Sequence, residues 1–135
     1  MSEHDERLAL SSQPQVPLAL VKTKEAYRSW HSYLRNIHRI DRYTIGAKID
    51  EVFISLLEFI YHACFASDKF EKLSCLTGAI TKSDLLKFLL QLAWEQKIID
   101  HKRYGALLLD LDEIGRMLGG WKRAIHAKAP NRYSK

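Results

Sequence analysis

The chain has 135 residues, the length of one domain, which excludes multi-domain architectures and allows a sizeable core without disulfides or a metal. Its 47% hydrophobic and 27% charged residues are ordinary for a globular protein and exclude wholesale disorder. Twenty-one Lys and Arg against 16 Asp and Glu give a net charge of +5, which favours polyanionic partners such as nucleic acid or an anionic membrane surface.

The first segment, residues 1–16, is polar, carries Pro14 and has no sustained apolar period, which predicts a disordered N-terminal arm. Its acidic residues are opposite in sign to the basic start of a secretory signal. The most apolar run, residues 52–66, contains Glu58 and His62 and is too short to span a bilayer. We therefore expect a cytoplasmic protein without a membrane partner.

Residues 17–129 carry helical periods throughout, and the chain has only six Gly and three Pro, too few for the regular turns of an all-β fold. The first predicted helix starts near Pro17 and extends to about Ile37. The second runs from about Tyr43 to Ala66 after the segment HRIDRY breaks the pattern. Four long helices with short loops predict an all-α, antiparallel up-down-up-down four-helix bundle.

The second helix has two apolar rows, one more than a single bundle interface requires. One row runs from Ile49 to Ala63, and the other comprises Phe53, Leu57, Ile60 and Cys64. Two interpretations stay open: the helix is buried at the centre of the bundle, or the second row faces another subunit.

The third and fourth helices are predicted over about residues 69–99 and from Asp100 to about residue 129. Asp68 and Glu71 resemble a capping box, and Asp100 is a candidate cap of the fourth helix. Poor helix formers around Gly78 predict a bend. The fourth helix has the clearest period in the chain, at Tyr104, Leu107, Leu111, Ile114, Leu118, Trp121 and Ile125. Residues 130–135 form a basic C-terminal tail.

The positive charge is concentrated at the two ends of the predicted bundle: residues 18–43 carry six cations and two anions, and residues 101–135 carry eight and three. In the first helix, Lys24, Arg28, His31, Arg35 and His38 follow steps of three and four residues and form one stripe, which Arg39 and Arg42 extend. In the fourth helix the candidate phosphate-binding residues are Lys102, Arg116, Lys122, Arg123 and Lys128. A solvated helix face is the simpler explanation of either stripe alone, but the first and last helices are neighbours in such a bundle. We therefore expect one shared basic surface that binds sugar-phosphate backbones.

Gly115, Gly119 and Gly120 in the predicted fourth helix each cost about 1 kcal/mol relative to alanine, so they need a compensating role. Gly115 and Gly119 are four residues apart and lie on one side of the helix. This spacing predicts close approach of a neighbour, either inside the bundle or across a subunit boundary.

Catalytic and metal-binding patterns are absent from the sequence: it has no nucleotide-binding glycine motif, no zinc-protease motif and no nucleophile elbow. Arg28 and His31, like Arg35 and His38, are closer together than the Arg and His of helical ribonucleases. Cys64 and Cys75 lack metal-ligand spacing, and the expected state is two free thiols, although the sequence does not tell whether they ever pair. We expect no catalytic residue, no metal and no cofactor.

Two segments carry a family resemblance: RYTIGAKIDEVF at residues 42–53 and IGRMLGGWKR at residues 114–123. Over about residues 17–129 the chain resembles the four-helix-bundle family that includes the accessory variability determinants of diversity-generating retroelements and proteins encoded in ribosomal-RNA intervening sequences. In this resemblance Arg42, Tyr43 and Gly46 belong to the loop-to-helix signature, and residues 118–123 to the last-helix signature.

The resemblance implies a homopentameric barrel of bundles that associates with a reverse transcriptase and its template RNA, supports mutagenic copying and has no active site. Three hypotheses follow: a nucleic-acid-binding accessory subunit of a reverse transcriptase, which leads, a ribosomal-RNA-associated structural protein, and a small helical ribonuclease. The sequence does not reveal which nucleic acid is bound, which face contacts the reverse transcriptase, or how many subunits assemble.

Overall fold

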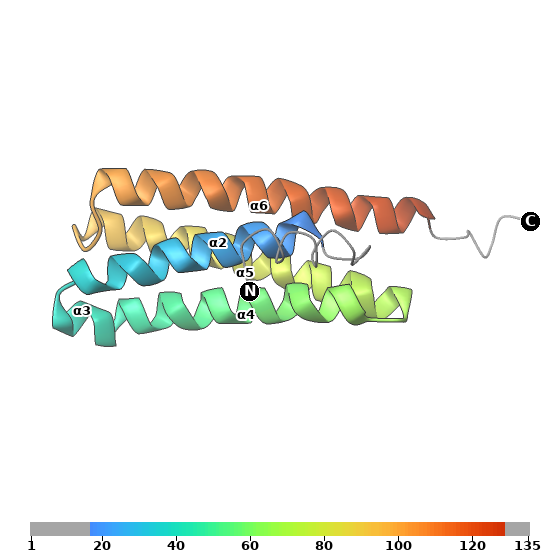
Figure 1. Cartoon of the computed structure of the whole chain (residues 1–135), viewed down its shortest axis with the longest axis horizontal. Coiled ribbons are helices and arrows are strands. Elements are labelled where there is room, and N and C mark those ends of the chain that lie inside the picture. The colour runs from blue at the N-terminus through green and yellow to red at the C-terminus, as the bar shows by residue number, and fades with distance from the viewer. Residues whose placement is uncertain (1–16, 129–135) are drawn as a thin grey trace, which may run out of the picture.

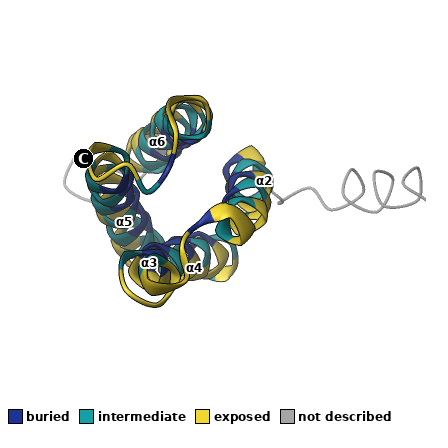
Figure 2. Cartoon of the chain, turned by 90° about the vertical axis from the view of Figure 1, so that its left-hand side faces the viewer, coloured by how far each residue is buried: buried dark blue, intermediate teal, exposed yellow. Residues whose placement is uncertain are grey.

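The computed structural model describes residues 17–128, and these residues form helices without strands. Four long helices, α2 (Leu18–Tyr33), α4 (Ile45–Phe65), α5 (Lys69–Glu95) and α6 (His101–Lys128), run alternately up and down (Figure 1). Viewed end-on, they lie in the cyclic order α2, α4, α5, α6 (Figure 2), and α6 contacts α2 to complete the ring. The predicted all-α bundle is confirmed. The expectations for residues 1–16 and 130–135 lie outside the described residues.

The connection between α2 and α4 differs from the prediction. The first helix ends at Tyr33 and continues as a single 3-10 turn, η1 (Leu34–Asn36), so it does not extend to Ile37 as expected. The segment expected to break the helical pattern forms a short helix, α3 (Arg39–Tyr43). Thr44 then adopts a non-helical backbone, which separates α3 from α4, and its Oγ1 donates to the carbonyl of Ile40 at 2.9 Å.

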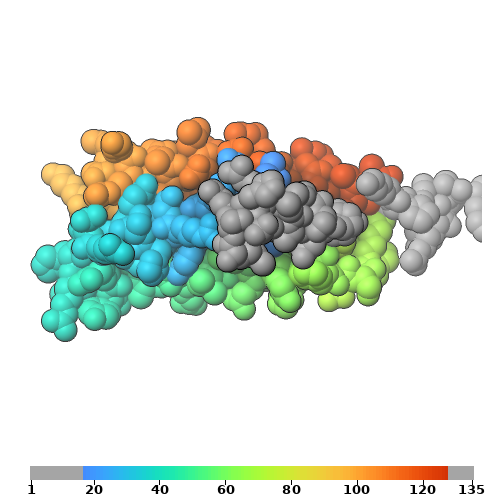
Figure 3. Space-filling view, viewed as in Figure 1, coloured from blue at the N-terminus to red at the C-terminus, as the bar shows by residue number. Residues whose placement is uncertain are grey.

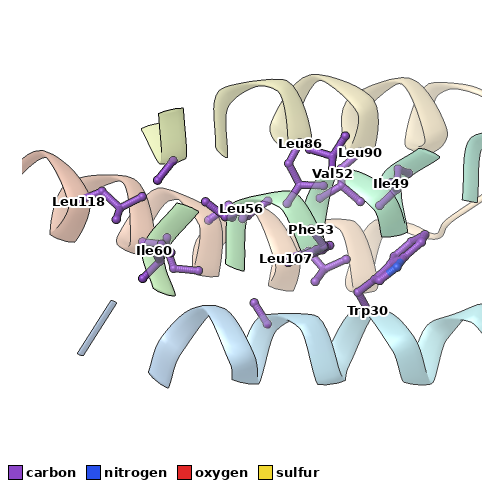
Figure 4. Close-up of a cluster of buried hydrophobic side chains, with 14 of the residues drawn as sticks. Trp30, Ile49, Val52, Phe53, Leu56, Ile60, Leu86, Leu90, Leu107 and Leu118 are labelled. Carbon is purple, nitrogen blue, oxygen red and sulfur yellow. The ribbon is translucent and has the colours of Figure 1, made fainter. Parts of the chain in front are cut away.

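The core follows the apolar periods of the sequence (Figure 4). Leu107, Leu111, Ile114 and Leu118 of α6 are fully buried, as the period predicts. Both rows of α4 also contribute, because Phe53 and Ile60 of the second row are as completely buried as Ile49 of the first. These two side chains therefore pack inside this chain. Leu57 and Cys64 of the same row are only half-buried, so the alternative that this row also faces another subunit stays a prediction.

Two aspartates begin the last two helices. The carboxylate of Asp68 accepts from the backbone N–H of Phe70, and that of Asp100 accepts from the N–H of Arg103 at 2.8 Å. The guanidinium of Arg103 also pairs with Asp100 at 3.1 Å. The predicted caps at Asp68 and Asp100 are confirmed, and they lie where α5 and α6 leave the ends of the bundle; the capping-box bond from Glu71 stays a prediction.

The glycines differ in what surrounds them. A Cβ atom at Gly78 of α5 would lie 2.6 Å from the Phe59 ring of α4, so this glycine allows the two helices to approach closely. By contrast, a Cβ at Gly115 would meet no atom within 4 Å, and one at Gly119 would meet only a nitrogen of Arg123 in its own helix. The prediction that Gly115 and Gly119 admit a neighbour inside the bundle is therefore wrong, because no neighbouring helix in the described chain reaches them.

Candidate nucleic-acid interface

The basic stripe of α2 lies on the outer surface, on the side of the helix that borders α4. Tyr27 marks that side, because its hydroxyl donates to Asp50 Oδ1 of α4 at 2.9 Å. At about 100° per residue, the stripe residues lie within roughly 100° of Tyr27, turned away from α6. Four of them line or flank a shallow hollow beside Tyr27, and all four are exposed: Lys24, Arg28, His31 and Arg35.

The stripe continues past the end of α2. Arg35 lies in η1 and His38 is the residue before α3, so the regular helical spacing of the stripe ends at Tyr33. Arg39 and Arg42 are on α3 and are exposed, and the guanidinium of Arg39 lies 5.9 Å from the centre of the Tyr43 ring. Helix α2 runs toward the end of the bundle at which α3 lies (Figure 1), so the cations of η1 and α3 lie at that end.

The cations of this group are not neutralised by carboxylates within the described part of the chain. The ion pairs of residues 17–128 involve Lys22, Lys48, Lys87 and Arg103, none of which belongs to the predicted stripe of α2. Among the described residues, Lys24, Arg28, Arg35 and Arg42 therefore have no carboxylate partner.

The cations of α6 lie elsewhere. Arg116 and Arg123 border a hollow of about 420 Å³ between α5 and α6, together with Lys87 and Asp112. Lys102 is exposed in the first turn of α6, and Lys122 is half-buried. The side chain of Lys128 lies outside the described residues. Figure 3 shows the face on which α2 lies between α4 and α6.

The seam between α2 and α6 is acidic, which separates the two basic groups. Lys22 of α2 pairs with Glu113 of α6 at 3.6 Å, and Asp110 and Glu25 lie in the same seam close enough to interact electrostatically. The expectation of one shared basic surface is therefore wrong. The α2 stripe faces the α4 side, the arginines of α6 face the α5 side, and carboxylates lie between them.

Burial raises the pKa of Asp110; Lys22 opposes this shift, and Glu113 and Glu25 add to it. A carboxyl whose pKa is higher in the folded state favours folding when protonated, so its ionised form opposes folding at neutral pH. We expect Asp110→Asn to raise the free energy of unfolding at pH 7 by about 0.5 kcal/mol or less. The gain should vanish as the pH falls through the titration of the carboxyl. Thermal unfolding of the variant and the parent chain at pH 7, and at a pH below the titration of this carboxyl, measures the gain. A variant less stable than the parent chain at pH 7 would contradict the prediction.

Groups that could support other chemistry are dispersed or buried. Burial raises the pKa of both Cys64 and Cys75, and the two are free thiols. Within residues 17–128, no three side chains of His, Cys, Asp or Glu gather closely enough to hold a metal ion. In the same range, no helix is both long and apolar enough to cross a membrane.

Sequence reasoning missed the hollow between α5 and α6 as a unit. The sequence marked Gly115 and Gly119 by their spacing, but it did not place them together with Ser83. The structure brings all three to the same hollow, beside Arg116 and Arg123. Only the packing register of α5 against α6 makes this arrangement visible.

Comparisons with known proteins agree with the fold. A family model described as bAvd-like matches residues 18–125. No curated protein matches the chain. A solved structure from Bacteroides thetaiotaomicron, described as a protein with unknown function from the S23 ribosomal protein family, superposes with a TM-score of 0.58. It is 15% identical and covers 76% of this chain and 98% of its own, a likeness that shows the fold alone.

Proposed function

The chain belongs to the bAvd-like family of accessory variability determinants of diversity-generating retroelements, and we propose that it is a non-enzymatic, nucleic-acid-binding accessory subunit. In this role it associates with the reverse transcriptase of the element and with its template RNA, and it supports mutagenic reverse transcription. The observation that carries the proposal is the group of exposed cations on α2 and α3 that have no carboxylate partner within the described chain.

The chemistry of these side chains favours phosphate as the ligand. Guanidinium groups present several N–H donors in a plane and bind phosphate oxygens in pairs, and Arg28, Arg35, Arg39 and Arg42 supply four of them at one end of the bundle. Contacts of this kind position a strand without reading its sequence, because the phosphate is the same at every nucleotide. An accessory subunit that holds a template needs this property.

The salt dependence of RNA binding tests the proposal. If about four cations contact phosphates, the slope of log K against log salt should be near −2.8 for single-stranded RNA, or near −3.6 for a duplex. Fluorescence anisotropy with labelled template RNA at several salt concentrations measures the slope. A slope indistinguishable from zero would remove the proposal, and tighter binding to ribosomal RNA than to the template would favour the ribosomal-RNA alternative.

We also propose that the chain assembles as a homo-oligomer, with five subunits as the number that the family resemblance implies. Apolar side chains on the outer face of α4 support an interface: Ile54, Tyr61 and Phe65 are exposed, and the rings of the last two lie 4.9 Å apart. Light scattering should give a mass near five times that of the chain. A monomer across the concentration range would contradict this part of the proposal.

A further inference from the structure

The hollow between α5 and α6 has the size of a ligand pocket. Its volume of about 420 Å³ falls within the range of about 300–1,000 Å³ that is typical of small-molecule sites. It is bordered by side chains of two adjacent helices that lie side by side along the bundle (Figures 1 and 2).

A buried hydroxyl in this hollow has no hydrogen-bond partner. Ser83 is only 1% exposed, and its Oγ finds no acceptor or donor within the described chain. Other hydroxyls of α5 are satisfied differently: Thr77 donates to the carbonyl of Leu73 at 2.9 Å, and Thr81 donates to that of Thr77 at 3.0 Å. An unpaired buried hydroxyl is unfavourable, and no group of the described chain supplies the hydrogen bond that Ser83 lacks.

The glycines of α6 keep the hollow open. Gly115 and Gly119 both border it, and side chains at these positions would project into space that no other helix occupies. Glycine in a helix interior costs about 1 kcal/mol relative to alanine. These two glycines do not serve packing inside the described chain, so two roles remain for them: the space that they leave beside the hollow, and the approach of another subunit, which stays a prediction.

The charges around the hollow favour an anion. Lys87 is already paired, at 3.3 Å with Asp112 and at 3.9 Å with Asp84. The hollow is lined by three cations and two carboxylates. Arg116 and Arg123 enter no ion pair among residues 17–128, so these two guanidinium groups have no carboxylate partner in that range. A group with two negative charges and several acceptor oxygens fits this donor set.

We propose that the hollow binds a phosphoryl group, to which the Ser83 hydroxyl and the guanidinium groups of Arg116 and Arg123 donate hydrogen bonds. The inference deepens the proposed function and rests on it for the source of the phosphate, which is a nucleic-acid strand or a free nucleotide. It places a second phosphate contact on the α5 side of the bundle, apart from the α2 stripe and beyond the acidic seam.

Two variants and one control test this site. Gly119→Leu fills the hollow, and Ser83→Ala removes the hydroxyl. Gly105→Leu is the matched control, because Gly105 also lies in α6, a Cβ there meets no atom within 4 Å, and it does not border the hollow. Circular dichroism checks that all three variants fold. Ser83→Ala should melt at a temperature no lower than the parent chain, because it removes an unpaired buried hydroxyl.

Calorimetric titration at low salt uses three probes: inorganic phosphate, adenosine monophosphate and an oligoadenylate of about 12 nucleotides. Gly119→Leu and Ser83→Ala should weaken binding about tenfold or more, while Gly105→Leu binds as the parent chain does. If the variants bind inorganic phosphate and adenosine monophosphate more weakly, the site accepts a free phosphate. If they bind only the oligoadenylate more weakly, the strand supplies the phosphate. Both results support the proposal.

Unchanged affinity for every probe in both variants would overturn the proposal, as would a parent chain that binds none of them. The two proposals fail separately. If the oligoadenylate binds equally to Gly119→Leu but is lost when Arg28 and Arg35 are replaced, the hollow fails and the proposed function stands. If a monophosphate binds through the hollow while no RNA binds the parent chain, the proposed function fails and the site stands.

Discussion

Replacing Trp30 by alanine should lower the free energy of unfolding by about 3–5 kcal/mol, the cost of removing a large aromatic from a core. Trp30 belongs to α2, and its side chain is fully buried in the core of the bundle (Figure 4). Its ring stacks on Phe53 of α4 at 6.5 Å, and its Nε1 donates to Asp50 Oδ1 at 3.3 Å. The substitution thus removes apolar contacts and one of the two donors to Asp50, the other being the hydroxyl of Tyr27.

Urea unfolding followed by circular dichroism measures this loss. Phe88→Ala is the control, since Phe88 is an aromatic on α5 that is 61% exposed, and its removal should change the stability by no more than about 0.5 kcal/mol. If Trp30→Ala and Phe88→Ala lose similar amounts, the contact of α2 with α4 does not depend on this ring.

The parts of the fold that the sequence predicts are those that a repeated period defines. In α6 the apolar residues recur from Tyr104 to Ile125, about six turns, and only one face of a helix can satisfy such a pattern, so Leu107 and Leu118 are buried as expected. In α4 the sequence showed two rows but not which of them faced inward. The structure buries Phe53 of the second row against Trp30 and Tyr27, while Leu57 of that row is half-buried.

The parts that the sequence did not predict are those that depend on a few residues or on two helices at once. Helix α3 is only five residues long, too short for any apolar period, and it ends where Thr44 adopts a non-helical backbone. The direction of the α2 stripe depends on which side of α2 meets α4, and that is fixed by the bond between Tyr27 and Asp50. The hollow between α5 and α6 was not predicted for the same reason, because it depends on how two helices pack against each other.

Reversing the charge at two stripe positions, Arg28→Glu with Arg35→Glu, should weaken binding of template RNA by about 100-fold at low salt. Each lost charge-assisted contact is worth about 1.5–3 kcal/mol, and every tenfold change in affinity corresponds to about 1.4 kcal/mol. Both side chains are exposed and neither has a carboxylate partner within residues 17–128, so the fold should be unaffected. Anisotropy with labelled RNA measures the loss.

The matched control is Lys48→Glu on α4, where an exposed cation already pairs with Glu51 at 3.7 Å. It also replaces a positive by a negative charge, yet it lies outside both basic groups, so any loss of affinity should be far smaller. The slope of log K against log salt distinguishes the loss of phosphate contacts from a general change in the electrostatic field of the protein. Losing two phosphate contacts to a single strand should reduce the slope by about 1.4, because each contributes about 0.7. Weaker binding with an unchanged slope would mean that Arg28 and Arg35 act on the RNA without contacting its backbone, and the α2 stripe would then not be the phosphate-binding surface.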